Sequence, residues 1–319
     1  MNENKEKLPE AGGKSDKDME AYGVFLLQRN EPIHVLATLV PPSQYNDPGV
    51  KDAMILELDK WKQFEAYELV EDQGQDRIDG RWAVNKKEEH DGLKVAMKAR
   101  YCLRGFKEEH KPRSDSPTVD RISTKLLYAI AGNEGWKLEC IDVTSSFLQG
   151  SDLDREIFVK PPKEAQVEGY LWKMKKAAYG LYDASRRWWV KVMEELKELG
   201  GRTLLGDEST IYFHKDGEFA GIIGLHVDDF QGTGNDWFFR NVMDSIANKF
   251  KISKREIQRF RFTGVDVHGQ DNGDVQTCQE SYVEALEKIT IKPDKRPLTI
   301  EQRRVQTLQR ASWKNYLVE

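Results

Sequence analysis

The sequence lacks the features that mark secreted, membrane-spanning or disulfide-rich proteins. It has three cysteines, and their wide spacing offers no CxxC pair and no disulfide framework. No run approaches the roughly 18 apolar residues of a membrane span, and the N-terminus has no hydrophobic core of a secretion signal. These absences predict an intracellular protein of a reducing compartment, without a membrane partner.

The sequence also has no surplus of positive charge. Lysine and arginine together number 49, against 54 aspartates and glutamates, so the formal net charge is −5. This balance argues against a wholly basic nucleic-acid-binding surface, although a local basic groove would still act through its own field. The six histidines are scattered, and no HExxH motif or Cys/His cluster indicates zinc.

What is present predicts a mixture of helices and strands over a length that can bury a sizeable core. Residues 1–20 contain almost nothing to bury and are predicted to be disordered. Asp47-Pro48 has the form of a helix cap followed by a first-turn proline. The apolar residues that follow at helical spacing are Val50, Met54, Leu58, Trp61 and Phe64. Further helices are predicted near 122–130, 184–201 and 236–250.

Strands are predicted between these helices from runs of β-branched and aromatic residues. They cover "RWAVNKK", "LKVAMKARYCLRGF", "LECIDV", "TIYFHK" and "FAGIIGLHVDDF". Hairpin turns are predicted at His90-Asp91-Gly92, Asp216-Gly217 and Asn272-Gly273, and "GTGND" (232–236) is predicted to be a turn into a helix. No regular βαβ rhythm is visible, which favours an α+β fold over a doubly wound sheet.

Two adjacent acids, Asp228 and Asp229, interrupt the apolar strand pattern, and Asp142 ends the strand "LECIDV". Burying carboxylates is costly unless something compensates their charge. If the two strands are neighbours in one sheet, the three acids meet and form a site for Mg²⁺. Two such ions about 3.5–4 Å apart promote in-line phosphoryl displacement. The competing interpretation is that the Asp-Asp pair marks a solvated turn.

Six segments, in order, resemble the reverse transcriptase of copia-type LTR retrotransposons, and the resemblance runs from about residue 45 to residue 301. They are "AMILELDKWKQFEAYELVE", "GRWAVNKKEEHDGLKVAMKARYCLRGFKE", "DSPTVDRISTKLLYAIAGNEGW", "IDVTSSFLQGSDLDREIFVKPP", "LWKMKKAAYGLYDASRRWW" and "LHVDDF". The last stands where the family has Tyr-Val-Asp-Asp.

The resemblance implies a right-hand polymerase with fingers and a ferredoxin-like palm sheet packed on helices. The implied divisions are a disordered or extended lead-in (1–45), fingers (46–120), a palm with the catalytic aspartates (121–265) and a partial thumb or connection (266–319). The family continues into RNase H, which is absent here, as are protease and integrase. We therefore expect a fragment or a truncated element.

The resemblance also implies roles for individual residues. Asp142, Asp228 and Asp229 would be the catalytic carboxylates that bind two Mg²⁺ ions, with Mn²⁺ as an alternative. The backbone carbonyl of Val143 would be a further metal contact, and Phe147 would lie beneath the incoming sugar and exclude a 2′-hydroxyl. Its simpler interpretation is a core phenylalanine.

Lys98 and Arg100 alternate on one strand face and resemble the fingers residues that hold the triphosphate; an ordinary exposed strand face is the alternative. Residues 98–113 hold six Lys/Arg against two acids, and residues 173–191 hold six against one. In the second segment Arg186 and Arg187 are expected to contact primer or template, and the interleaved tryptophans to help hold nucleotides. Those tryptophans are Trp172, Trp188 and Trp189. Solvated helix faces explain such runs nearly as often, and at least one of the two adjacent tryptophans is expected to lie in the core.

Two positions depart from the family pattern. His226 replaces the tyrosine before Val227-Asp228-Asp229 and, with Val227, is expected beside the primer end. Asp183 stands where the family usually has glutamine, at a position expected to contact the nucleotide. An acid there repels a triphosphate unless a lysine or arginine pairs with it.

The function predicted from the sequence is RNA-directed DNA polymerase. Its partners would be an RNA or DNA template with primer, dNTPs, and the RNase H and integrase domains of a parent Pol polyprotein. Its location would be a cytoplasmic virus-like particle or the nucleus. One alternative is a decayed or repurposed chain that binds nucleic acid or a partner without catalysis. Another is a two-metal nuclease.

Overall fold

The computed structural model describes residues 38–88, 95–270 and 273–284. Three predicted features therefore lie outside the described residues: the disordered segment 1–20, the turn at His90-Asp91-Gly92, and Asn272 of the last hairpin. The described residues form a mixed structure of helices and mostly antiparallel sheets, as the α+β prediction requires. Within this described part, no helix has the length and apolar character needed to cross a membrane.

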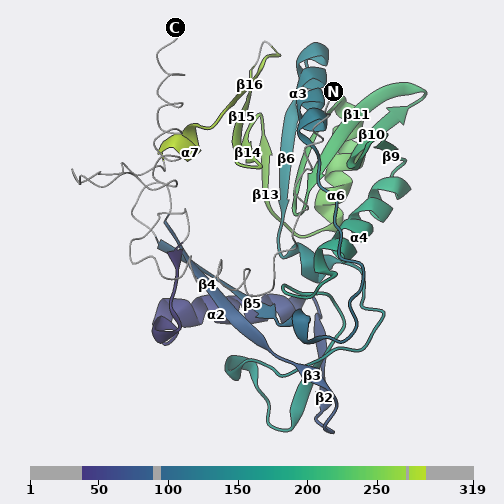
Figure 1. The fold of residues 1–319 in the computed structure, drawn as a ribbon. Coiled ribbons are helices and arrows are strands. Elements are labelled where there is room, and N and C mark those ends of the chain that lie inside the picture. The colour runs from purple at the N-terminus through teal and green to yellow at the C-terminus, as the bar shows by residue number, and fades with distance from the viewer. Residues whose placement is uncertain (1–37, 89–94, 271–272, 285–319) are drawn as a thin grey trace, which may run out of the picture. The chain divides into compact units, whose positions relative to one another are not determined.

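The largest sheet of the described residues, the central sheet, has six antiparallel strands (Figure 1). Its order is β13-β6-β12-β11-β10-β9. The strands are β6 (Leu138–Val143), β9 (Arg202–Leu204), β10 (Asp207–Lys215), β11 (Glu218–His226), β12 (Asp229–Gly234) and β13 (Ile252–Ile257). The hairpin turn at Asp216-Gly217 is confirmed, and both of its residues have positive φ. The strand predicted at 138–143 is also confirmed.

Helices and a second sheet bury the two faces of this sheet. Helix α4 (Ala184–Glu198) and the continuous run α5 (Asp236–Phe238), π-turn η5 (Phe239–Met243) and α6 (Asp244–Lys249) pack on one face. The core residues on that face include Ile141, Val143 and Phe230. The opposite face carries α3 (Arg121–Glu134) and the sheet β14 (Arg259–Phe262), β15 (Val265–Gly269) and β16 (Val275–Cys278). Successive residues of a strand point to opposite faces of the sheet, so the strands contribute side chains to two separate cores.

A β-hairpin packed on a helix forms the N-terminal part. Strand β1 (Thr38–Leu39) pairs with β4 (Gly80–Glu88), which pairs with β5 (Val95–Leu103). Helix α2 (Pro48–Gln63) buries Val50, Met54, Leu58 and Trp61, as the spacing predicts. Asp47 occupies the N-cap position, but its side chain makes no capping hydrogen bond. The first turn η1 (Pro42–Gln44) precedes it.

A four-stranded sheet was not predicted. It joins β2 (Tyr67–Glu71), β8 (Tyr170–Met174), β7 (Phe158–Val159) and β3 (Arg77–Ile78) in the order β2-β8-β7-β3. Short helical turns complete the described elements: η2 (Gly105–Lys107), η3 (Ser146–Gln149), η4 (Lys163–Ala165) and α7 (Glu280–Glu284). The divisions predicted at residues 45, 120 and 265 stay predictions.

The prediction that "GTGND" is a turn is wrong for its first three residues. Gly232 and Gly234 belong to the buried strand β12, and only Asn235 caps the helix, by accepting a 3.0 Å hydrogen bond from the Phe238 backbone N–H. A Cβ built on Gly234 would lie 2.5 Å from the Phe238 ring. The glycines are therefore explained by the close packing of that ring on the sheet.

Candidate active site

The three aspartates singled out by the sequence lie together at one end of the central sheet. β6 and β12 are neighbours, and Asp142 and Asp229 are directly opposite each other in the ladder. The backbone N–H of Val143 donates to the Asp228 carbonyl oxygen at 2.9 Å. All three aspartates are half-buried. The condition set by the sequence, that the two strands be neighbours, is met.

The electrostatics of this end of the sheet are unfavourable to negative charge. Burial, with the carboxylates of Asp228, Asp142 and Glu256, raises the pKa of Asp229 to about 7. Burial also raises the pKa of Asp228. The negative charge of Asp142 raises this pKa further, whereas the positive charges of Lys98 and Arg100 lower it. A cation bound here would offset the repulsion.

The donors at this end of the sheet suit a divalent cation in their chemistry. Within residues 38–88, 95–270 and 273–284, no three His, Cys, Asp or Glu side chains are already gathered as a ligand set. Carboxylates and a backbone carbonyl are nevertheless the hard oxygen ligands that Mg²⁺ and Mn²⁺ prefer. The raised pKa values of two of the acids show how strongly the site disfavours uncompensated charge.

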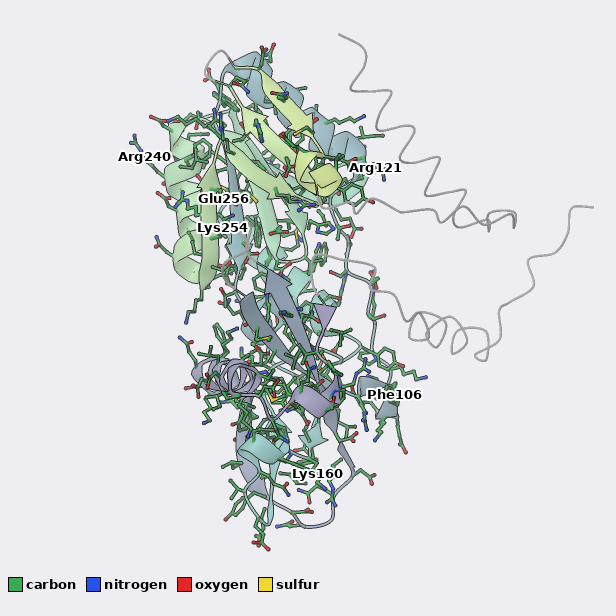
Figure 2. All side chains as sticks on the ribbon, turned by 90° about the vertical axis from the view of Figure 1, so that its left-hand side faces the viewer. Phe106, Arg121, Lys160, Arg240, Lys254 and Glu256 are labelled. Atoms are coloured by element: carbon green, nitrogen blue, oxygen red, sulfur yellow. The ribbon has the colours of Figure 1, made fainter. Side chains whose placement is uncertain are left out.

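Strand β13 forms the outer wall of the site, a role that no local feature of its sequence indicates. A register shift between Ile252 and Lys254 lets the Ser253 hydroxyl donate to the Asp142 carboxylate. Lys254 lies opposite Asp142 and forms a 2.7 Å ion pair with Glu256, and Figure 2 shows the two side chains close together on this strand.

A two-residue turn, Val227–Asp228, joins β11 to β12. Val227 has φ +56°, a left-handed conformation that β-branched residues rarely adopt. Such a residue costs on the order of 1–3 kcal/mol and persists only where its surroundings fix it. The indole N–H of Trp188 donates to the Val227 carbonyl oxygen at 2.6 Å. His226 lies opposite Asp229, with its ring centre 6.1 Å from that of Phe262 on β14.

The predicted triphosphate residues lie on β5, beside the acids. Burial lowers the pKa of Lys98, as do the positive charges of Arg100 and Lys60, whereas Asp142 and Asp228 oppose this shift. The ammonium group of Lys98 is therefore within electrostatic range of both acids and both cations. Lys60, on α2, was not singled out by the sequence.

An aromatic bridge links the predicted triphosphate and sugar residues. The Arg100 guanidinium lies over the ring of Tyr179, 5.2 Å from its centre. The same ring meets Phe147 edge to face at 4.9 Å. Tyr179 belongs to the Tyr-Gly-Leu segment, whose role sequence reasoning did not identify.

Asp183 is buried at the N-terminus of α4, and both of its carboxylate oxygens are occupied. Arg155 donates to them at 2.7 and 3.0 Å, and Arg187 donates at 2.6 Å. Burial acts to raise the pKa of Asp183, but these hydrogen bonds outweigh it and hold the pKa below its usual range. Arg155 also pairs with Glu108 at 2.9 Å. Arg155 was missed because nothing local in the sequence links it to position 183.

Side chains of the basic segment 173–191 make more contacts within the protein than the charge of the segment suggests. Trp172 and Trp188 are fully buried, so the expectation that these two help hold nucleotides is wrong, whereas the expectation that one of the adjacent tryptophans lies in the core is confirmed by Trp188. Trp189 donates its indole N–H to the Ser209 hydroxyl at 3.0 Å. The Arg186 guanidinium lies over the Trp189 ring at 4.7 Å. The roles of Arg186 and Arg187 toward primer or template stay predictions.

Comparison with known proteins gives a family match over most of the chain. The model of the family described as "Reverse transcriptase (RNA-dependent DNA polymerase)" matches residues 64–298. The retrovirus-related Pol polyprotein from transposon RE1 of Arabidopsis thaliana is 27% identical over 230 residues, covering 68% of this chain and 15% of the relative. That from transposon TNT 1-94 of Nicotiana tabacum is 30% identical over 192 residues, covering 58% and 14%. The chain thus spans a small part of the relatives' length.

Among solved structures, a foamy viral protease-reverse transcriptase in complex with double-stranded DNA matches 87% of this chain and 43% of its own, with a TM-score of 0.43 and 14% sequence identity. A second structure of this viral protein with double-stranded DNA matches 99% and 64%, with the same TM-score and 12% identity.

Proposed function

The chain belongs to the reverse transcriptase (RNA-dependent DNA polymerase) family, in its copia type, and from this premise we propose that it extends a primer 3′-hydroxyl with deoxynucleotides. The observation that carries the proposal is the direct pairing of Asp142 with Asp229, beside the turn that holds Asp228. We assign residues 46–120 to the fingers, 121–265 to the palm and 266–319 to the thumb or connection.

In this mechanism the chain holds the reactants and compensates their charge. Asp142, Asp228 and Asp229, with the Val143 carbonyl, would bind the divalent ions. Two Mg²⁺ ions, or Mn²⁺, would supply Lewis-acid activation of the primer hydroxyl and stabilisation of the leaving group. The carboxylate that the Ser253 hydroxyl orients, Asp142, keeps its place between β12 and β13.

The fingers residues would bind the incoming nucleotide. Lys98 and Arg100 would neutralise triphosphate charge opposite the acids, as phosphoryl transfer requires. Phe147 would lie beneath the sugar, where an aromatic ring excludes a 2′-hydroxyl. Its ring is supported from one side by Tyr179.

The proposed partners are nucleic acid and the other domains of a Pol polyprotein. His226 and Val227 would adjoin the primer end, with Arg186 and Arg187 contacting the primer–template backbone. The template could be RNA or DNA, because the acids would contact only the reacting groups. RNase H and integrase domains of a parent polyprotein, in a virus-like particle or the nucleus, are proposed partners.

Primer extension tests the proposal. The chain is incubated with poly(rA)/oligo(dT), dTTP and Mg²⁺, beside the variant Asp228→Asn and the control Asp236→Asn. Asp236 is exposed and pairs only with Arg240 at 3.4 Å among the described residues, so its loss of charge leaves the site intact. We expect incorporation by the wild type and Asp236→Asn, and a loss of at least about 100-fold in Asp228→Asn.

Two outcomes would contradict the proposal. Tight binding of poly(rA)/oligo(dT) without incorporation by any of the three proteins supports the non-catalytic binder. Shortening of a labelled strand in the absence of dNTPs supports a two-metal nuclease. Loss of incorporation in Asp236→Asn as well as Asp228→Asn would mean that the assay does not report on the three acids.

A further inference from the structure

The turn that carries Asp228 is held in a conformation that its own sequence disfavours. Val227 is the first of two residues between paired strands and has φ +56°, where glycine is the favoured residue. A valine keeps that conformation only if the surrounding structure fixes it. Contacts from outside the turn must therefore hold it.

Two hydrogen bonds from outside the hairpin fix the turn, one to each of its carbonyl groups. The Val143 backbone N–H on β6 donates to the Asp228 carbonyl at 2.9 Å. The Trp188 indole N–H on α4 donates to the Val227 carbonyl at 2.6 Å. The first belongs to the sheet itself, whereas the second is made by a side chain.

The direction of the Trp188 donor is set by packing. The indole is 1% exposed and meets Phe250 and Phe230 edge to face, at 4.9 and 6.2 Å between ring centres. Tryptophan has a single N–H donor, so with the ring fixed it points at one place. A purely apolar core residue at this position would fill the same space without reaching the turn.

The next residue offers an internal comparison. Trp189 lies on the same helix and also donates its indole N–H, but to the Ser209 hydroxyl on β10 at 3.0 Å. The two adjacent tryptophans thus use the same kind of donor, the indole N–H, for different acceptors. Of these two bonds, only the one from Trp188 reaches the candidate active site.

We propose that Trp188 is a positioning residue for catalysis, because its indole N–H holds the Val227 carbonyl and so keeps Asp228 and Asp229 facing Asp142. The proposal rests on the proposed polymerase function, and it adds a residue that contacts neither substrate nor metal. Its role is to hold the strained turn closed against relaxation of Val227 to a negative φ.

The test removes the donor while keeping the ring. At position 188, tryptophan is replaced by β-(3-benzothienyl)alanine, in which sulfur takes the place of the N–H, and in a parallel variant by Phe. Trp189→Phe is the matched control. For each full-length chain we measure kcat and KM for dTTP on poly(rA)/oligo(dT), the melting temperature, and amide hydrogen exchange of the peptide spanning 224–231.

We expect the 188 variants to lose roughly 3- to 10-fold in kcat, the equivalent of one hydrogen bond, with KM little changed. Exchange in peptide 224–231 should quicken by a similar factor, whereas Trp189→Phe should leave that exchange unchanged. In a Val227→Gly background, where φ +56° carries no strain, the loss caused by the 188 variants should shrink to less than about twofold.

The proposal is overturned if the benzothienyl variant and Trp189→Phe behave alike in exchange of peptide 224–231, or if the benzothienyl variant keeps the kcat of the wild type. It is also overturned if the loss at position 188 is the same in the wild-type and the Val227→Gly backgrounds. Should the wild type fail to incorporate dTTP, the proposed function fails. The exchange measurement would still decide whether Trp188 holds the turn.

Discussion

At the scale of single residues, the acid at position 183 illustrates how charge is tolerated inside the fold. Asp183 is 2% exposed, yet Arg155 and Arg187 saturate both of its oxygens. Arg155 pairs in turn with Glu108, and Arg187 pairs with the exposed Asp154. The carboxylate of Asp183 is thus neutralised within a network of ion pairs that connects α4 to two loops. Such pairing with arginine is the condition under which an acid would not repel a triphosphate.

This arrangement predicts that Asp183→Gln harms stability more than nucleotide binding. Removing one partner of a buried ion pair costs about 3–5 kcal/mol. Because glutamine keeps an acceptor oxygen, we expect a fall of about 2–3 kcal/mol in the free energy of unfolding, measured with urea. The KM for dTTP should stay within about twofold of wild type.

Asp154→Asn is the control for the Asp183 experiment, because it touches the same network at an exposed position. We expect it to change the free energy of unfolding by less than about 1 kcal/mol. A marked fall in the KM for dTTP in Asp183→Gln, with stability unchanged, would instead indicate that Asp183 faces the nucleotide.

The residues of the candidate site differ in how visible they are in the sequence. Asp142, Asp228 and Asp229 can be found because acids interrupt apolar strand patterns, and their meeting needs only that two strands pair. Arg155 and Ser253 cannot be found in this way, since each gains its role from a partner 28 or 111 positions away. Trp188 looks like any core tryptophan until the direction of its N–H is known.

At the scale of elements, a glycine pair joins the end of β5 to the segment before α4. The Leu103 backbone N–H donates to the Tyr179 carbonyl at 2.7 Å. Gly180 has φ +94°, and a Cβ there would lie 1.9 Å from the Leu103 carbonyl oxygen. A Cβ on Gly105 would lie 2.4 Å from the Gly180 carbonyl oxygen. The Arg-Gly-Phe and Tyr-Gly-Leu segments therefore contain glycine because their backbones touch.

Gly180→Ala should separate these two segments. Gly200 is the matched control, because it also has positive φ (+89°) but no atom within 4 Å of a built Cβ. Gly200→Ala should cost only the left-handed penalty of about 1–2 kcal/mol. Gly180→Ala adds a backbone clash, so we expect a loss of about 4 kcal/mol or more, measured by urea unfolding.

Gly180→Ala should also displace Tyr179, and with it the contacts to Phe147 and Arg100. Discrimination against rUTP relative to dTTP is therefore expected to weaken in this variant and to stay intact in Gly200→Ala. Equal unfolding free energies for the two alanine variants would contradict the close backbone contact.

Elements with local signals were predicted well, and elements defined by distant pairing were not. Helix α2 and strand β6 follow from local sequence patterns, and α3 ends at the left-handed C-cap residue Gly135. The pairing of β2 with β8 joins residues about a hundred positions apart and leaves no periodic signal. Gly232 and Gly234 were misassigned because packing of Phe238, rather than turn chemistry, requires glycine there.

At the scale of the whole molecule, the acid cluster makes folding stability depend on pH and on cations. The chain is acidic overall, with a net charge of −5. Asp228 and Asp229 both have raised pKa values, so the folded state holds protons there more tightly than the unfolded chain does. Other groups act in the opposite direction: Asp183 and Asp207 have lowered pKa values. A single variant is needed to isolate the effect of the cluster.

Asp229→Asn isolates that effect. The pKa of Asp229 rises from 3.8 to about 7 on folding, so between these values the folded protein keeps a proton that the unfolded chain has lost. The free energy of unfolding contributed by this group is therefore full below pH 3.8 and falls as pH rises through 7.

Metal-free wild type should lose stability relative to Asp229→Asn across that window, measured as the difference in melting temperature, whereas Asp236→Asn should follow wild type. Mg²⁺ binds the ionised carboxylates, so it should stabilise wild type more at about pH 8 than at about pH 5 and Asp229→Asn little at either. Parallel pH profiles for wild type and Asp229→Asn would show that the carboxylate at 229 is not held against its neighbours' charge.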